Sequence, residues 1–391
     1  MFSSRTNWPL APNRLSELLR ERRERGVPIL DLTESNPTRC GLALAGEMVL
    51  GPLHNPRALV YEPEPRGLAA ARDAVTAYYS ERGVFLNPDQ IFLTTSTSEA
   101  YSFVFRLLAN PGDKILAPQP SYPLFDFLGA LNDVEVLPYP LLYEGGWQLD
   151  LHSLASGWQP GIRAVLLVHP NNPTGSFIKR CELDRLIEIC SRHGASLIAD
   201  EVFADYGFAA DAERVTTHSQ TSELLTFTLS GLSKISALPQ MKLGWIVVNG
   251  PAEIRQEALA RLEVIADTYL SVSAPIAWAA PEWLAHRGAI QAQILDRVQS
   301  NLRKLDALLT ADSPVSRLKL EGGWYAILRV PATRSDEDWA AELLTQVGVF
   351  VHPGHFYDFP SAGFLVLSLL PPPAVFEDAL SRTISLICAQ S

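Results

Sequence analysis

Three polar residues that can do chemistry each follow a short apolar segment in the middle of the chain. Asn172 lies in the turn after Arg163–Val168, and Asp200 follows the apolar triplet Leu-Ile-Ala. Lys234 comes shortly after Leu225–Leu229. Ligands of open α/β sheets bind in the crevice outside the carboxyl ends of the strands, where such residues would meet. The spacing therefore predicts one site that contains an amide, a carboxylate and an amine.

The sequence around the lysine favours a covalent role. Lys234 ends the segment S-G-L-S-K, in which glycine and hydroxyl residues flank the amine close to the end of a strand. Lysine amines placed in this way can act as nucleophiles. Structural interpretations stay open for the other two residues: Asp200 could cap the segment after its strand, and Asn172 could be an ordinary turn residue. Their order along successive strands favours a shared chemical site.

The elements that must position these residues alternate along the chain. Short unbroken apolar segments predict strands, and segments with helical periodicity lie between them. The predicted strands are 91–95, 114–117, 134–137, 163–168, 196–199, 225–229 and 243–248, and the predicted helices are 13–25, 67–82, 98–108, 122–131 and 180–193. Because unbroken apolar strands are buried on both faces, we expect an α/β fold whose mostly parallel sheet is covered by helices on both faces.

Beyond residue 251 the pattern changes to long helical segments followed by a few strands. The predicted helices are 252–266, 281–287, 289–309 and 335–346, and the predicted strands are 324–330 and 364–369. This order indicates a smaller α+β domain, joined to the large one through a long helix. We expect an N-terminal segment at 1–45 that packs with the small domain, a large site-bearing domain at 46–287 and a small C-terminal domain at 288–391.

The composition excludes several classes of protein. The chain has 391 residues, of which 47% are hydrophobic and 19% charged, and these values exclude a disordered chain. The net charge is −11 with scattered basic residues, so we expect neither nucleic acid nor a membrane as a partner. Four dispersed cysteines and histidines without ligand spacing predict no disulfide framework and no metal site. No leader or membrane-spanning stretch is visible, which predicts a cytoplasmic protein.

Several sequence blocks resemble those of one known family. They are H-P-N-N-P-T-G at 169–175, A-D-E-V-F at 199–203, S-G-L-S-K at 230–234, Y-x-P-x-P-x-G at 61–67, the turn at 95–100, P-S-Y at 120–122 and G-G-W-Y at 322–325. In this order the blocks resemble the fold-type I pyridoxal-phosphate enzymes, and among them most the class I and II aminotransferases. The likeness extends from Tyr61 to the C-terminus and implies the fold-type I transferase architecture, with the large domain binding the cofactor.

The resemblance implies a role for each residue at the ends of the central strands. Lys234 would form a Schiff base with pyridoxal 5'-phosphate and then act as a general base. Asp200 would keep the pyridine nitrogen protonated, because an opposite charge favours the charged form. Asn172 would donate a hydrogen bond to the phenolate oxygen, and Tyr122 would stack on the ring face. For Tyr122, packing in the core is the structural alternative.

The cofactor phosphate is expected at the start of the helix at 98–108. Backbone N–H groups at a helix N-terminus bind anions, and Ser96, Thr97 and Ser98 open this helix. Hydroxyl residues here replace the glycines that are frequent in the family. Plain capping of the helix is the structural alternative for the three residues.

Further phosphate contacts follow from the same resemblance. Lys242 stands where relatives usually carry an arginine, and Ser230 or Ser233 would add a hydroxyl. Lysine binds phosphate as a point charge rather than through a fork. Tyr61 would reach the phosphate of the neighbouring subunit, which implies a homodimer with shared active sites. A solvated lysine and a loop aromatic are the structural alternatives for Lys242 and Tyr61.

Two further residues depart from the family's pattern. Phe203 stands where relatives carry a tyrosine that hydrogen-bonds the cofactor oxygen. Val366 stands where the C-terminal strand of relatives carries the arginine that binds the α-carboxylate of the substrate. A carboxylate in a site shielded from water needs a bidentate partner. Either Arg39 or Arg329 takes over this role, or the substrate lacks a conventionally placed carboxylate.

The expected activity is that of a pyridoxal-phosphate aminotransferase, which moves an amino group from an amino acid or amine to a 2-oxo acid. Asn36, in a turn that relatives fold over the substrate, is a further candidate for substrate binding. A lyase, decarboxylase or cyclising synthase with the same cofactor is the alternative, which Phe203 and Val366 favour. A non-catalytic ligand-sensing domain of this fold is disfavoured, because Lys234 and Asp200 are both present.

Overall fold

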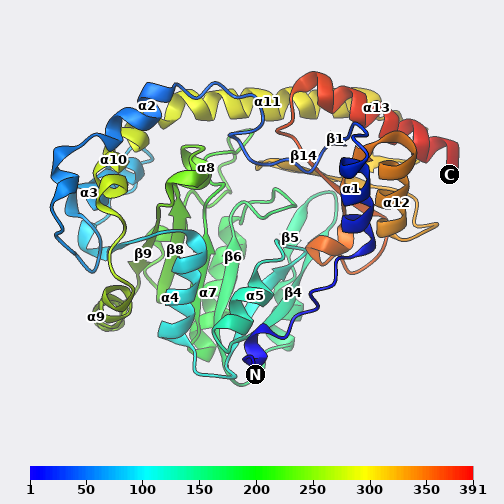
Figure 1. Cartoon of the computed structure of the whole chain (residues 1–391). Helices are drawn as coiled ribbons and strands as arrows, with labels where there is room; N and C mark the ends of the chain where they lie inside the picture. The colour runs from blue at the N-terminus through cyan, green and yellow to red at the C-terminus, as the bar shows by residue number, and fades with distance from the viewer. Residues whose placement is uncertain (391) are drawn as a thin grey trace.

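An eight-stranded sheet forms the centre of the larger part of the computed structural model, which describes residues 1–390 (Figure 1). Its strands are β2 (Ile91–Thr94), β3 (Lys114–Gln119), β4 (Glu135–Tyr143), β5 (Trp147–Leu149), β6 (Ile162–Val168), β7 (Ser196–Asp200), β8 (Thr226–Gly231) and β9 (Gly244–Asn249). The strand order is β2-β9-β8-β7-β6-β3-β4-β5. The strands β4, β3, β6, β7 and β8 are parallel neighbours, while β9, β2 and β5 pair antiparallel at the edges. The predicted mostly parallel sheet is confirmed.

Helices cover both faces of this sheet. They are α3 (Ala69–Ser80), α4 (Thr97–Leu108), α5 (Phe125–Leu131), α6 (Leu151–Ser156), α7 (Arg180–His193), α9 (Ala252–Tyr269) and α10 (Ala274–Ala285). Successive residues of a strand point to opposite faces, and both faces of β9 are apolar. Ile246 and Val248 share a buried cluster with α4 and α9, whereas Trp245 and Val247 share one with α3 and α10. The helices α6 and α7 cover the remaining strands on the second face.

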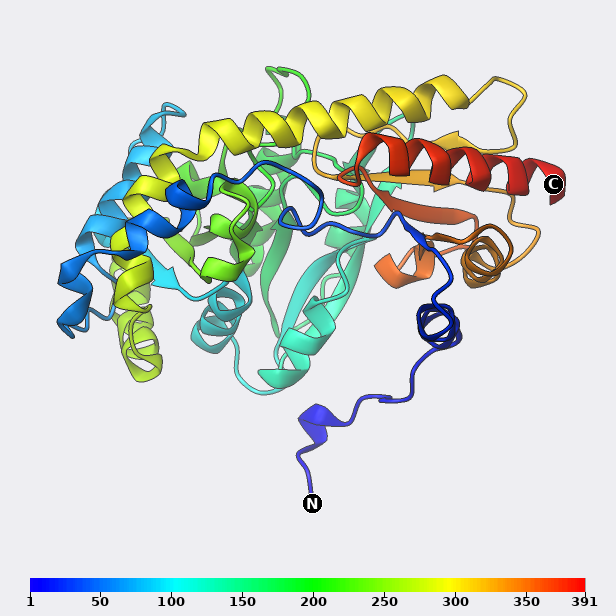
Figure 2. The same cartoon turned by 45° about the horizontal axis from the view of Figure 1, so that its top comes forward.

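A four-stranded antiparallel sheet forms the smaller part of the molecule, with strand order β10-β11-β14-β13. The strands are β10 (Ser316–Arg317), β11 (Tyr325–Arg329), β13 (His352–Pro353) and β14 (Phe364–Ser368), and the helices are α11 (Arg287–Leu308), α12 (Asp336–Glu342) and α13 (Pro373–Gln390). The long helix α11 runs from α10 across to this sheet, where it lies beside α13 (Figure 2). Within residues 1–390, none of the helices combines the length and the apolar composition that crossing a membrane requires.

The N-terminal segment packs mainly on the smaller part. Its strand β1 (Leu30–Asp31) pairs with β12 (Val349–Phe350), and its helix α1 (Arg14–Glu24) lies against α12. The Leu32 carbonyl accepts a hydrogen bond of 2.6 Å from the Ser368 N–H at the end of β14. This pairing carries the turn that follows Leu32 to the end of the small sheet.

The first residues of the chain reach back to the larger part instead. The Arg5 guanidinium forms an ion pair with Asp133, with 2.6 Å between Nε and Oδ1. The Trp8 ring meets the Phe127 ring of α5 edge to face, with 5.3 Å between the centroids. The extended chain before α1 is visible at the bottom of Figure 2. This segment therefore links the two parts of the molecule outside the main chain connection through α11.

Candidate active site

The carboxyl ends of the central parallel strands bring the three predicted residues together. Asn172 follows β6, Asp200 ends β7, and Lys234 follows β8 in a short helix, α8 (Leu232–Ile235). Val168 of β6 pairs with Asp200, and Asp200 pairs with Leu229 of β8. Because neighbouring strands lie about 4.8 Å apart, the three ends form one edge. The charge of Asp200 also acts on the Lys234 amine, which confirms their proximity.

The Asp200 carboxylate is buried and held by two hydrogen bonds. Its Oδ1 accepts from the Val202 N–H at 3.0 Å, and its Oδ2 accepts from the Tyr101 hydroxyl at 2.8 Å. Burial raises the pKa of Asp200, while the two hydrogen bonds and the charge of Lys234 lower it. Sequence reasoning missed Tyr101, although this residue lies one turn after Ser98 on the same face of the predicted helix.

The Lys234 amine is enclosed by aromatic rings. Its Nζ atom lies 5.1 Å from the centroid of the Trp324 ring and 5.5 Å from that of the Phe203 ring. Within residues 1–390, Nζ has neither a hydrogen-bond acceptor nor an ion-pair partner. Burial lowers the pKa of Lys234 to about 8, an effect that the charge of Asp200 partly offsets. The amine is therefore neutral more often than that of an ordinary lysine, as a nucleophile requires.

The Asn172 amide is buried, and its Oδ1 atom has no partner among the described residues. The preceding residue fixes the turn, because the Asn171 amide donates to the Pro120 carbonyl and the Thr174 hydroxyl, both at 3.0 Å. A buried polar atom without a partner costs about 1–3 kcal/mol. Such an atom at the edge of the sheet suits a group that binds a ligand.

The turn at 171–175 also lies directly against the smaller part of the molecule. Gly175 has φ +67°, and a Cβ atom there would lie 2.4 Å from the Gly322 carbonyl oxygen. The Glu321 N–H donates to the Gly175 carbonyl at 3.1 Å, and the Gly323 N–H donates to the Tyr206 carbonyl at 2.9 Å. Glycine permits this close backbone contact. The contact places Trp324, the residue after Gly323, beside the Lys234 amine.

The predicted phosphate residues meet at a second corner of the same edge. The Ser96 hydroxyl caps α4 and accepts from the Glu99 N–H at 3.2 Å, while the first N–H groups, those of Thr97 and Ser98, have no partner within the helix. A Cβ atom on Gly244 would lie 3.0 Å from the Ser96 carbonyl carbon and 3.1 Å from the Ser230 carbonyl oxygen. Three segments of backbone therefore converge where the helix begins.

Two other phosphate candidates border this corner. Lys242 lies two residues before Gly244, is exposed, and has no ion-pair partner within residues 1–390. Its φ of +52° turns the chain sharply before β9. Ser233 precedes Lys234 in α8 and is partly exposed, whereas Ser230 is buried with its hydroxyl 3.4 Å from the Glu201 carbonyl. Ser230 therefore lies beside the start of α4 through its contact with Gly244, and the phosphate roles of Lys242 and Ser233 stay predictions.

The two predicted tyrosines lie at the surface of the single chain. Tyr122 is 43% exposed; burial raises the pKa of the Tyr325 and Tyr357 hydroxyls, and the nearby Tyr122 raises both further. Tyr61 is 73% exposed and lines a surface pocket with Trp278 of α10. Within the described chain, Tyr61 has no contact with the other predicted site residues. Its predicted contact with a neighbouring subunit therefore stays a prediction.

The turn after β1 holds two of the predicted substrate residues. The Asn36 Oδ1 atom accepts from the N–H and the hydroxyl of Thr38, so this side chain stabilises its own turn. Arg39 is exposed on the same turn and has no ion-pair partner within residues 1–390. The Ser35 side chain hydrogen-bonds the Tyr325 hydroxyl, which places the turn beside the start of β11.

The structure does not bring Arg329 to this site. Arg329 lies at the opposite end of β11 from Tyr325, about 13 Å along the strand for four residues. Its guanidinium lies 5.9 Å from the ring centroids of Tyr143 and Phe364. Val366 is fully buried on β14 opposite Ile327, so this strand presents no cation there.

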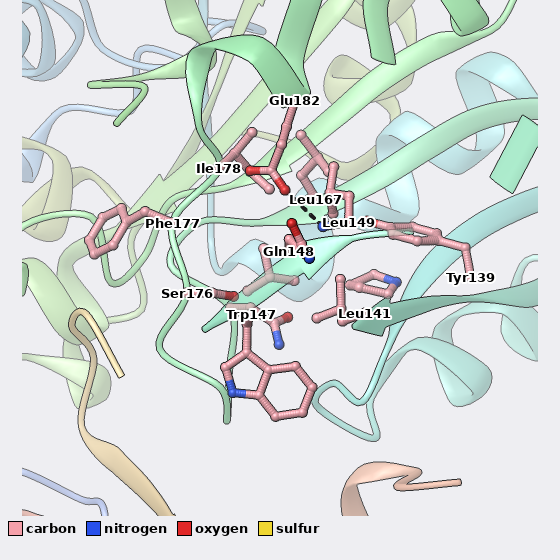
Figure 3. Close-up of a pocket in the computed structure, with 13 residues that line it drawn as sticks. Tyr139, Leu141, Trp147, Gln148, Leu149, Leu167, Ser176, Phe177, Ile178 and Glu182 are labelled. Carbon is pink, nitrogen blue, oxygen red and sulfur yellow. Dashed lines mark hydrogen bonds between the residues drawn. The ribbon is translucent and has the colours of Figure 1, made fainter. Parts of the chain in front are cut away.

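A separate narrow pocket lies behind the turn at 171–178 (Figure 3). Its volume of about 10 Å³ is close to that of a single water site. Its walls include Trp147 and Phe177, and the Glu182 carboxylate beside it accepts from the Leu149 N–H at 2.8 Å. None of the predicted site residues lines it, so this pocket is not the active site.

Comparison with known proteins decides the family. Residues 55–375 match the family model described as aminotransferase class I and II. The chain belongs to this family. It is a pyridoxal-phosphate-dependent aminotransferase, whose substrates are an amino acid and a 2-oxo acid. The predicted fold, cofactor and type of reaction are thereby confirmed.

Individual relatives agree with the family. The aminotransferase is 27% identical over 367 residues to the glutamate-pyruvate aminotransferase AlaA of Escherichia coli, covering 92% of this chain and 90% of the relative. It is 27% identical over 372 residues to an alanine aminotransferase of Mycobacterium bovis, covering 91% and 85% of the two chains. The crystal structure of an aminotransferase from Escherichia coli superposes with a TM-score of 0.87 at 24% identity, covering 99% and 98% of the chains.

The residues present fit pyridoxal phosphate. The site contains an enclosed amine on Lys234, a buried carboxylate on Asp200 and an unpartnered amide on Asn172. The start of α4 offers N–H groups for a phosphate, and the exposed Lys242 is the candidate that would add a positive charge. The cofactor requires a nucleophilic amine for its aldehyde, a carboxylate that accepts from its protonated ring nitrogen, an amide N–H that donates to its phenolate oxygen, and N–H groups for its phosphate.

The lowered pKa of Lys234 can be measured in the protein without cofactor. An amine-specific acylating reagent, with labelled peptides quantified by mass spectrometry, should give a midpoint near pH 8 for Lys234. The Asp200→Asn variant should give a lower midpoint, because the carboxylate raises this pKa and its loss removes that effect. Labelling of the exposed Lys319 should be the same in both proteins. A Lys234 midpoint at the ordinary lysine value of about 10.4 would contradict the enclosed site.

Proposed function

We propose that the aminotransferase acts through Lys234, with Asp200 and Asn172 as the residues that hold the cofactor ring. The observation that carries this proposal is the Lys234 amine, which is enclosed, unpartnered and next to a buried carboxylate. When bound, pyridoxal phosphate supplies an aldehyde that joins the amino group and a ring that withdraws electrons from it. The amine of Lys234 would take the proton from the α-carbon of the donor and return it to the cofactor carbon on the other side of the amino nitrogen.

The other predicted residues would fix the cofactor in place. The Asp200 carboxylate, oriented by Tyr101 and Val202, would keep the ring nitrogen protonated, because a negative charge stabilises the charged form. The N–H groups of Thr97 and Ser98 would bind the phosphate, because the N-terminus of a helix attracts anions. The same phosphate would also be bound by Lys242, Ser96, Ser230 and Ser233, and Tyr122 would cover the ring.

The role of Lys234 can be tested by trapping. Borohydride reduction of the protein with its cofactor should attach one adduct per chain, at Lys234, and Lys234→Ala should lose at least a thousand-fold in kcat. Lys319→Ala is the matched control, because Lys319 is an exposed lysine away from the site. Single-turnover reaction with an amino donor should leave one equivalent of pyridoxamine phosphate. An adduct on another lysine, or elimination or decarboxylation without pyridoxamine phosphate, would contradict the proposal.

We further propose alanine and glutamate as amino donors and pyruvate as an acceptor. The names of the relatives, glutamate-pyruvate and alanine aminotransferase, support this choice. Arg39 would bind the substrate carboxylate in place of the arginine that Val366 replaces. Its support is that Arg39 is unpaired among the described residues and sits on the turn bonded to Tyr325.

Two arginine variants separate the candidates for the carboxylate. Arg39→Ala should raise the KM for alanine at least ten-fold, because a charge-assisted pair is lost, whereas Arg329→Ala should change it less than two-fold. Steady-state kinetics with alanine and with the corresponding amine, ethylamine, measure the effect, and only alanine should respond. If both variants keep the KM of the parent protein, the carboxylate has another partner.

We also propose a homodimer in which Tyr61 reaches the site of the neighbouring subunit. Large apolar side chains near Tyr61 are exposed in the single chain, with Leu59 89% and Val60 57% exposed. Such neighbouring apolar residues are typical of an interface. The support for a shared site is that Tyr61 has no function within the described chain.

Mixed dimers test whether the sites are shared. A purified dimer of one Lys234→Ala chain and one Tyr61→Ala chain, isolated through two different tags, should have about half the activity of the parent dimer. One of its two sites would be complete, because Lys234 and Tyr61 of that site come from different chains. A dimer of one parent chain and one Lys234→Ala chain is the reference. Activity near zero in the first dimer, with half activity in the second, would exclude sharing.

The domain limits and the location are proposed in the same way. We propose that residues 1–45 move with a small domain at 288–391, and that 46–287 form the large domain. The pairing of β1 with β12 and the break between α10 and α11 support these limits, while the contact of Trp8 with α5 departs from them. A cytoplasmic location is supported by four free cysteines, because disulfides are rare in that compartment.

A further inference from the structure

The Lys234 amine has two aromatic neighbours that belong to different parts of the molecule. Phe203 follows β7 of the large sheet, whereas Trp324 immediately precedes β11 of the small sheet. Nζ lies 5.5 Å from the first ring centroid and 5.1 Å from the second. Within residues 1–390 Nζ has no hydrogen-bond acceptor, so these two ring faces and the charge of Asp200 are what stabilise its positive charge. A lysine ammonium over an aromatic face is stabilised by the electrons of the ring.

Packing holds the Trp324 ring in this position. Its centroid lies 5.1 Å from that of Phe203 and 5.0 Å from that of Tyr206, both in edge-to-face arrangements. The indole N–H is buried and has no acceptor among the described residues, so no hydrogen bond of the side chain fixes the ring. Its backbone is fixed instead, because the Trp324 carbonyl accepts from the Leu369 N–H at 2.7 Å. The ring is therefore held by packing and by its backbone, and it presents its face to the amine.

The same contacts tie Trp324 to the backbone that carries the lysine. The Gly323 N–H donates to the Tyr206 carbonyl at 2.9 Å, and the Tyr206 hydroxyl donates to the Lys234 carbonyl at 2.6 Å. Tyr206 thus connects the start of β11 with α8. Any displacement of the small sheet relative to the large one would move the ring face away from Nζ.

We propose that Trp324 is a positioning residue for Lys234: it holds the amine, once this is free of the cofactor, where the amine can carry the proton. This inference rests on the role proposed above for Lys234. Phe203 supplies the second face, in a position where relatives carry a tyrosine. The small domain then contributes to proton transfer through one ring.

Protein without cofactor provides the first test. Trp324→Leu removes the ring face, so the charged form of Lys234 loses stabilisation and its labelling midpoint should fall by about 0.5–1 pH unit. Trp324→Phe retains an aromatic ring whose face attracts a cation more weakly, so the Lys234 midpoint should fall less in this variant. Trp339→Leu is the matched control, because Trp339 is also fully buried in the smaller part but lies over Arg334 rather than Lys234. Its loss should destabilise the fold without moving the Lys234 midpoint.

The protein with cofactor provides the second test. Trp324→Phe should lower kcat about three- to ten-fold with less than a two-fold change in KM, and should shift the acid limb of the pH profile to lower pH. The isotope effect with α-deuterated alanine should increase, because proton transfer becomes slower. Equal Lys234 midpoints in Trp324→Leu, Trp324→Phe and parent protein, with an unchanged isotope effect, would overturn the inference. Failure of the underlying function is seen separately, as the absence of a borohydride adduct at Lys234 in the parent protein.

Discussion

Withdrawal of the Lys234 amine from water is the condition on which the site depends. A lysine in water is charged at neutral pH and cannot attack an aldehyde, whereas this amine meets aromatic rings and one carboxylate. Desolvation favours the neutral amine, and Asp200 opposes this effect enough to keep the pKa near 8. The balance leaves both forms of the amine populated close to neutrality, as a group that gives and takes one proton requires.

The topology of the large sheet is what brings these site residues together. Parallel strands β6, β7 and β8 end at one edge, so residues far apart in sequence meet there without a long loop. The helix α4 starts at the phosphate corner and carries Tyr101 to Asp200 one turn later. One helix therefore orients two separate groups that we propose to contact the cofactor. The small sheet completes the enclosure, because Gly175 and Gly322 allow two backbones to touch.

Local signals allowed most of the fold to be predicted from the sequence. The helix α7 was predicted with its observed ends, because Gly194 takes a left-handed conformation at its C-terminus. The predicted start of α10 was wrong. Pro281 was interpreted as the first residue of a helix, but it lies inside a helix that begins at Ala274. The helix α13 was missed because it begins at Pro373, the last of three consecutive prolines. The antiparallel direction of β9 was also not predicted, because periodicity carries no information on parallel or antiparallel pairing.

Site residues could be predicted where they follow a strand. They could not be predicted where contacts between segments distant in sequence set their positions. Asn172, Asp200 and Lys234 follow strands, so their meeting could be predicted. The contacts of Tyr101 and Trp324 depend on which helix and which sheet lie opposite, and a single sequence does not give this. Arg329 was a candidate by its charge alone, yet the direction of β11 carries it away from the site.

The segment before α1 has a practical consequence for handling the protein. Arg5 and Trp8 attach the N-terminus to Asp133 and Phe127 of the large part, while α1 is attached to the small part. A purification tag fused ahead of Met1 would be attached next to these two contacts and would pull on them as it moves. A tag placed after α13 would extend from the far end of the molecule and leave the two contacts intact (Figure 2).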